Sequence, residues 1–311
     1  MDITNKRYRT FNQHLREQFG EKVFKVSLDG GFDCPNRDGT VAYGGCTFCS
    51  AAGSGDFAGR RTDSIAKQFT KIKTRMHQKW RAGKYLAYFQ AFTNTHAPVA
   101  VLRATFEQAL AEDDVVGLAI GTRCDVLPDD VIEYLAELNQ RTYLWVELGL
   151  QTIHEKTAKL INRAHSLAAY EEAVAKLRQH DIRICSHIIN GLPGENRDMM
   201  METAKQVAAL DVQGIKIHLL HLLKGTPMVK QYERGQLQLM EQEAYVQLVC
   251  DQLEILPPEM VIHRITGDGP VDLLIGPMWS TKKWEVLNAI DTEMVRRDSQ
   301  QGKFYQRQKD L

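Results

Sequence analysis

The sequence has no net charge at pH 7, because its 39 basic residues balance 39 acidic ones. A chain without an overall positive field can bind nucleic acid only through a local patch. No apolar run reaches the roughly 20 residues that span a bilayer, and the polar residues 1–20 lack the apolar core of a secretory signal. We therefore expect a cytoplasmic protein with no membrane partner, whose six cysteines stay reduced.

The cysteine pattern lacks a fourth ligand. Cys34, Cys46 and Cys49 lie in a glycine-rich stretch, and no Cys or His follows Cys49 at short spacing. A tetrahedral zinc site needs four ligands, whereas three thiolates suit a [4Fe-4S] cluster with one iron open to another ligand. A zinc knuckle, a redox-active Cys46-x-x-Cys49 pair and plain core cysteines remain alternatives. The other three cysteines are expected in the core or lining a site: Cys124, Cys185 and Cys250.

Nearly continuous apolar runs predict strands that are covered on both faces. The runs are 23–28, 85–92, 115–122, 143–150, 182–190 and 214–222. Helical patterns lie between them, and the later strand starts are about 30 to 40 residues apart, as in βα units. The sequence predicts an α/β protein, in which a full or partial barrel fits better than a doubly wound sheet.

The pattern changes after residue 225, where helical segments surround a short strand near residues 260–265. We therefore expect a barrel with an N-terminal cysteine loop over 1–225. Residues 226–311 are expected to form a C-terminal α+β extension that closes over a substrate.

Four further motifs follow the cysteine loop: "TRCD" (122–125), "VELGLQTIHEKTAKLINRAH" (146–165), "INGLPGE" (189–195) and "LLKGTPM" (222–228). With the widened C-x11-C-x2-C loop they resemble radical S-adenosylmethionine (SAM) enzymes, in the YhcC/YtqA-type branch related to the radical-SAM domain of the Elongator catalytic subunit. The chain departs from that pattern at Gly121 and Cys124, where relatives often carry Glu and Pro. The resemblance implies a partial (β/α)6 TIM-like barrel, a [4Fe-4S] cluster on Cys34, Cys46 and Cys49, and SAM as cofactor.

The same resemblance implies SAM-binding roles for residues beside the cluster and at strand ends. Arg163 would meet the methionyl carboxylate, for which an Arg fork is well suited. The implied cofactor-binding residues are Phe48, Gln90, Asn94, Gln151, Arg163, His187, Asn190 and Gly191. Structural roles remain alternatives for several of them, such as a surface cation for Arg163 and a core histidine for His187.

Several charged groups are candidates for substrate binding. Glu147 and Lys216 lie on apolar strands, so they either pair internally or face a substrate. His263 and Arg264 are expected at the mouth of the site. Lys282 and Lys283 follow Ser280, which is a plausible helix N-cap, and could bind phosphates. Basic segments with aromatic residues, either RNA contacts or solvated helix faces, occur at 5–10, 71–84 and 293–309.

The resemblance implies that the chain generates a 5′-deoxyadenosyl radical and modifies the C5 side chain of the wobble uridine of tRNA. One such reaction turns carboxymethylaminomethyluridine into aminomethyluridine. The implied partners are tRNA, rather than DNA, and an electron donor such as flavodoxin or ferredoxin. A radical SAM enzyme acting on a small metabolite or protein, and a non-catalytic Fe-S protein that binds RNA, remain alternatives.

Overall fold

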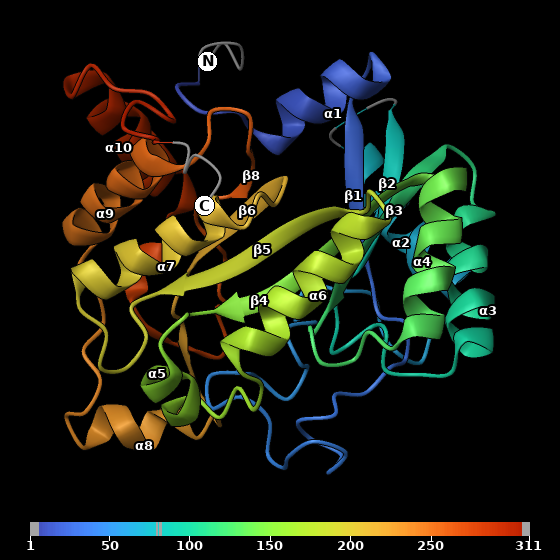
Figure 1. Cartoon of the computed structure of the whole chain (residues 1–311), viewed down its shortest axis with the longest axis horizontal. Helices are drawn as coiled ribbons and strands as arrows, with labels where there is room; N and C mark the ends of the chain where they lie inside the picture. Colours follow the sequence, from blue (N-terminus) through green and yellow to red (C-terminus); the bar gives the residue numbers. More distant parts are fainter. Residues whose placement is uncertain (1–5, 79, 81–82, 307–311) are drawn as a thin grey trace.

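The computed structural model describes residues 6–306 apart from 79, 81 and 82. Its centre is one curled sheet of seven parallel strands in the order β1-β2-β3-β4-β5-β6-β8 (Figure 1). The strands are β1 (Val23–Leu28), β2 (Lys84–Phe89), β3 (Val115–Thr122), β4 (Tyr143–Gln151), β5 (Arg183–Asn190), β6 (Gly214–Leu219) and β8 (Val261–Arg264). The first six confirm the strands that the apolar runs predict, with differences only at their ends.

The helices flank the sheet, most of them on its outer face, while the first one packs against β1 and β8 at the two edges. They are α1 (Phe11–Phe19), α2 (Ile65–His77), α3 (Val99–Leu110), α4 (Asp129–Arg141), α5 (Glu155–Leu160), α6 (Leu167–Gln179), α7 (Arg197–Ala209), α8 (Met228–Glu233), α9 (Gln242–Ile255) and α10 (Lys283–Arg296). The predicted N-cap of α6 is confirmed, because the Ser166 side chain accepts a hydrogen bond from the Ala169 amide. In the part of the chain that the structure describes, no helix is long and apolar enough to cross a membrane.

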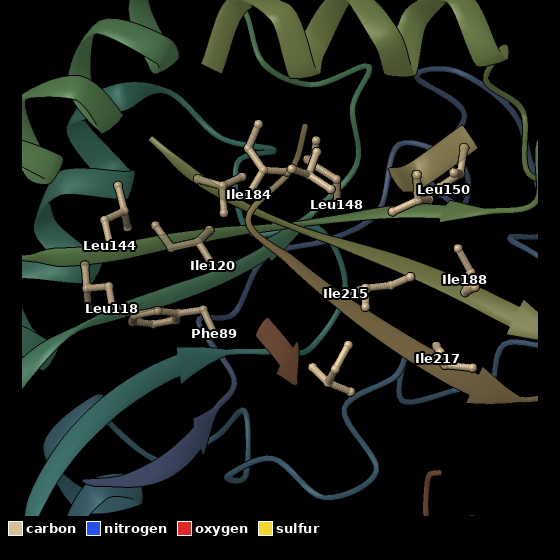
Figure 2. Packing of buried hydrophobic residues seen from close by; sticks show 14 of the residues in the cluster. Phe89, Leu118, Ile120, Leu144, Leu148, Leu150, Ile184, Ile188, Ile215 and Ile217 are labelled. Carbon is tan, nitrogen blue, oxygen red and sulfur yellow. The ribbon is translucent and has the colours of Figure 1, made fainter. Parts of the chain in front are cut away.

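The hydrophobic core lies between the sheet and these helices. Buried side chains such as Leu118, Ile120, Leu148 and Ile184 leave the strands on this outer side (Figure 2). Because successive strand residues point to opposite faces, the residues between them point to the inner side, where polar groups gather. Consecutive strand order with helices on one face is the arrangement of a partial barrel, and it excludes a doubly wound sheet.

The C-terminal segment completes the same sheet. Its strand β8 pairs in parallel with β6, and the short strands β7 (Leu222–Leu223) and β9 (Leu274–Gly276) pair with each other. The predicted helix start at Ser280 is wrong. Ser280 lies in a 3-10 helix (Met278–Thr281), its hydroxyl donates to the Pro277 carbonyl, and α10 begins only at Lys283.

The two edge strands, β1 and β8, do not pair with each other in the described sheet. The segment before α1 lies at the β8 edge instead, where Thr10 forms an isolated parallel bridge with Ile262. The Ile262 amide donates to the Arg9 carbonyl at 2.8 Å. The barrel is therefore open on one side, with residues from both ends of the chain at the opening.

Candidate active site

The three clustered cysteines lie around one pocket at the carboxyl ends of the strands. Cys34, Cys46 and Cys49 are half-buried and line a cavity of about 170 Å³. The Cys49 amide donates to the Cys46 carbonyl at 3.0 Å, which closes the turn between this pair. Gly44 and Gly45, with φ of 82° and 74°, supply the left-handed backbone that brings the chain into this turn.

A distant loop anchors the cysteine loop. Asn162, just after α5, donates from its side-chain amide to the Tyr43 carbonyl at 3.0 Å and the Gly45 carbonyl at 2.8 Å. In return, the Asn36 amide donates to the Asn162 carbonyl at 2.6 Å, and it lies 3.6 Å from the Cys46 sulfur. The conformation of residues 34–49 therefore depends on the loop that follows α5.

The thiols fit a cluster better than a single ion. Among the described residues, no three His, Cys, Asp or Glu side chains gather closely enough to hold one metal ion. The thiolates around a four-iron cluster stand further apart than those around one ion, and three of them leave one iron open. Burial raises the pKa of the Cys46 thiol to about 12 and also raises that of Cys49. Metal binding must therefore displace thiol protons.

Polar groups beside the cysteines come from the ends of β2, β3 and β4. Gln90, Arg123, Gln151 and His165 line the same pocket. Gln151 has a φ of 67°, which is unusual for a residue with a side chain. Gly149 makes room for it, because a Cβ there would lie 2.7 Å from the Gln151 side-chain nitrogen. The strained backbone thus folds the Gln151 amide back over Gly149, at the pocket.

The inner wall holds a buried charge cluster around Glu147, in which Lys216 forms the internal ion pair that was one of the two alternatives. Lys25 lies 2.6 Å from one carboxylate oxygen of Glu147, and His187 lies 3.1 Å from the other. Burial would raise the pKa of Glu147, but Lys216 and Lys25 hold it well below its usual range. Burial lowers the pKa of Lys216 to about 7, against the attraction of Glu147. Lys216 also donates to the Tyr88 hydroxyl at 3.1 Å.

Two family models match the sequence over most of the residues that build this site. The model of the Radical SAM superfamily fits residues 36–207, and that of the Radical_SAM C-terminal domain fits residues 212–296. The chain belongs to the radical SAM superfamily. Radical SAM proteins use a [4Fe-4S] cluster and SAM, and the free position of the cysteine set suits both.

Known relatives agree with this assignment. The uncharacterized protein YtqA of Bacillus subtilis is 75% identical over 98% of this chain and 94% of its own length. A tRNA uridine(34) acetyltransferase of Methanocaldococcus infernus is 24% identical over 53% of this chain, but only 31% of its own length. The structure of the M. infernus Elp3 with an N-terminal deletion shares the fold, with a TM-score of 0.67 at 16% identity. That alignment covers 90% of this chain and 64% of that one.

In this radical SAM protein Arg163 lines the pocket, as predicted, and its guanidinium is also bound by the protein's own carbonyl groups. Its guanidinium is 1% exposed, so it has almost no surface to offer SAM. It donates to the carbonyl groups of Leu150, Thr152 and His165. These carbonyl groups occupy the guanidinium N–H donors, so Arg163 fixes the backbone at the end of β4. Arg123 and His165 also line the pocket.

Four of the eight residues implied to contact SAM do not line the pocket. The Asn94 amide is buried and donates to the Phe89 and Gly121 carbonyls. Asn190 exchanges two hydrogen bonds with Gln252, at 2.9 and 3.0 Å. The other two are enclosed by apolar side chains: Phe48 packs with the cluster around Leu192 and Met228, and Gly191 lies against Met240. Of the eight implied residues, Gln90, Gln151, Arg163 and His187 border the pocket.

The predicted substrate residues separate into inner and outer groups. Lys216 and Arg264 line the pocket. His263 is buried beneath it, with its ring centroid 3.9 Å from that of Phe11 and 4.4 Å from that of Trp145. On the outside, Lys282 lies 3.2 Å from Glu285 and Lys283 lies 2.9 Å from Asp268, so both lysines have acidic partners.

The basic segments that the sequence singled out are largely ion-paired. In the segment 71–84, Lys71 lies 2.7 Å from Asp63 and Lys84 lies 3.3 Å from Glu21. Near the ends, Arg7 lies 3.1 Å from Asp298, and Arg297 lies 2.7 Å from Asp251. Residues 5, 79, 81, 82 and 307–309 of these segments lie outside the described residues. Solvated, paired helix faces account for most of this charge.

A basic groove lies at the open side of the barrel, where the sequence predicted its C-terminal border (His263, Arg264 and Lys283) but not its N-terminal one. It has a volume of about 510 Å³ and is bordered by β1, β8 and the start of α10. Four cations line it: Lys22, Lys25, Arg264 and Lys283. None of the described residues that line it is acidic. Arg264 also lines the inner pocket, so the groove and the pocket share this side chain. No local motif could signal the groove, because it joins residues about 240 positions apart in the chain.

Proposed function

We propose that this radical SAM protein modifies the C5 side chain of the wobble uridine in tRNA, turning carboxymethylaminomethyluridine into aminomethyluridine. The observation that carries the proposal is that Arg264, at the open side of the barrel, lines two cavities. These are the basic groove and the pocket that holds the three cysteines. Such an opening suits one nucleotide of a polymer, whose base enters while its phosphates stay in the groove.

The chain's residues divide the work between the two sides of the pocket. We expect Cys34, Cys46 and Cys49 to hold the cluster, with Gln90 and Gln151 beside the SAM. When bound, the cluster and SAM supply a 5′-deoxyadenosyl radical. His187, Lys216 and Arg264 lie further along the wall, on β5, β6 and β8, and are expected to face the substrate.

The proposed polymer is supported by relatives and by charge. The relative named tRNA uridine(34) acetyltransferase matches about half of this chain. The groove has four cations and no acid among its described lining residues, which favours phosphates although Lys25 and Lys283 have acidic partners outside the lining. An electron donor such as flavodoxin or ferredoxin is expected at the outer side of the cysteine loop. Tyr43, 77% exposed, and Phe57, 54% exposed, offer an apolar surface close to that loop.

The test is nucleoside mass spectrometry of tRNA from a strain that lacks the gene. We expect carboxymethylaminomethyluridine to accumulate and the aminomethyl products to disappear. The wild-type gene should restore them, and a gene with Cys34, Cys46 and Cys49 changed to Ala should not. An unchanged nucleoside profile in the deletion strain would exclude this substrate and favour a metabolite or protein substrate.

A further inference from the structure

A β-bulge in β8 places Arg264 inside the barrel. Ile262 pairs in register with Ile215 and Arg264 pairs with Lys216, so His263 is an extra residue on β8. Without it, the alternation of strand side chains would turn Arg264 outward, as it turns Ile262. The bulge lets both His263 and Arg264 face inward, where His263 packs on Trp145 and Arg264 lines the pocket. Bulges beside active sites commonly re-aim a side chain in this way.

Register places Arg264 at the end of a row of polar groups. His187 pairs with Lys216, and Lys216 pairs with Arg264, across the neighbouring strands β5, β6 and β8. Paired residues on adjacent strands carry their side chains side by side on one face. The row therefore forms one continuous wall of the pocket.

This wall carries more positive than negative charge. Glu147 is the acidic residue of the pocket lining, and it is bound to Lys216 and Lys25. The Arg264 backbone pairs with β6, but its guanidinium makes no hydrogen bond or ion pair with any residue that the structure describes. Burial lowers the pKa of His187 to about 4, so this neighbour is a neutral imidazole at pH 7. A half-buried guanidinium without an acceptor is costly unless a ligand supplies one.

We propose that Arg264, with Lys216 beside it, binds a carboxylate at the end of the substrate's side chain and so selects substrates that carry one. This inference rests on the proposed function, whose substrate ends in a carboxymethyl group. The Arg fork matches a carboxylate with two parallel hydrogen bonds. Lys216 is 5% exposed, so the inner end of this wall favours the narrow tip of an extended side chain over a phosphate of the polymer backbone.

The experiment compares two anticodon stem-loops that differ in one group. One carries carboxymethylaminomethyluridine at the wobble position, and the other carries the corresponding carboxamide. The protein holds its reconstituted cluster and SAM, without reductant, and binding is measured by fluorescence anisotropy. The variants are Arg264→Gln, Arg264→Lys and the control Arg178→Gln, whose guanidinium pairs with Asp211 on the outer surface. Lys216 stays in place, because its removal would leave Glu147 short of a partner.

We expect the wild-type protein and the control to prefer the carboxylate stem-loop by about 10- to 100-fold, the usual effect of a charge-assisted hydrogen bond. Arg264→Gln should bring this ratio close to one. Arg264→Lys should recover part of it, since it keeps the charge but not the fork. Because the readout is a ratio between two ligands, a general loss of packing would not reproduce it.

Two results would overturn the inference: no preference in the wild-type protein, or an equal loss of affinity for both stem-loops in Arg264→Gln. The second result would assign Arg264 to the phosphate backbone. Conversion of the carboxylate stem-loop after addition of reductant tests the proposed function separately. A preserved preference without conversion would reject the reaction and keep the carboxylate site.

Discussion

At the residue scale, Glu147 is the charge on which the inner wall depends. It is 1% exposed and holds two lysines, so changing it to Gln leaves both cations without compensation. We expect Glu147→Gln to lower the free energy of unfolding by about 3 kcal/mol, measured by urea denaturation. The control is Glu137→Gln, which breaks only solvent-exposed pairs with Arg103 and Arg141 and should cost much less. Equal losses of unfolding free energy in the two variants would mean that the negative charge of Glu147 is not needed to stabilise the buried lysines.

The cysteines give a second test at this scale. Changing Cys34, Cys46 or Cys49 to Ala should leave the reconstituted protein with little iron and sulfide, because two thiolates cannot retain the cluster. The same change at Cys250, which is fully buried in the core, should leave the cluster content unaltered. Iron and sulfide analysis after anaerobic reconstitution measures both. A normal cluster in any of the first three variants would remove that cysteine from the ligand set.

At the element scale, the loop after α5 controls the shape of the cysteine loop. Asn162 has a φ of 51° and anchors the backbone on either side of Gly44. Asn162→Gly keeps the backbone freedom and loses the side-chain bonds, whereas Asn162→Ala loses both.

We expect both Asn162 variants to fold and to bind less cluster, with the Ala variant less stable by about 1 kcal/mol because of its strained φ. Iron content and thermal unfolding separate the two effects. Full iron content in Asn162→Gly would show that the side-chain bonds are dispensable for the cysteine loop.

Much of the fold was predictable because long apolar strands and a capped helix such as α6 are local signals. Bulges are not local signals. The irregularities at Gln151 and His263 change which side chains face the pocket, and they depend on the partner strand rather than on the residue itself. Hydrogen-bond partners also depend on the folded chain rather than on the local sequence. The motif around Arg163 could therefore be located from the sequence, but the carbonyl groups that accept hydrogen bonds from its guanidinium could not.

At the scale of the whole molecule, the open side of the barrel is the predicted path for RNA. Lys22 and Lys283 both line the basic groove. Lys22 directly precedes β1, and Lys283 is the first residue of α10. Changing both to Ala should weaken tRNA binding and lower the slope of log affinity against log salt by up to about two, one for each phosphate that is no longer neutralised by a lysine.

Lys176 and Lys205, on the outer helices α6 and α7, are the matched pair for this experiment. Their replacement by Ala should leave the slope unchanged, and reductive SAM cleavage without RNA should survive in both double variants. If the Lys22 and Lys283 variant kept the wild-type affinity and slope, the groove would not be the RNA path, and the exposed face of α2 would become the next candidate.

The anchoring of the cysteine loop also fixes an order of events during synthesis. Cys34 leaves the ribosome long before Asn162, and Met228, whose amide donates to the Thr47 carbonyl, follows later still. At about 5 to 20 residues per second, the loop waits on the order of ten seconds for the Asn162 anchor. During that interval its thiols are open to oxidation or to the wrong metal. We therefore expect the cell to deliver iron and sulfide only after translation of the barrel is complete.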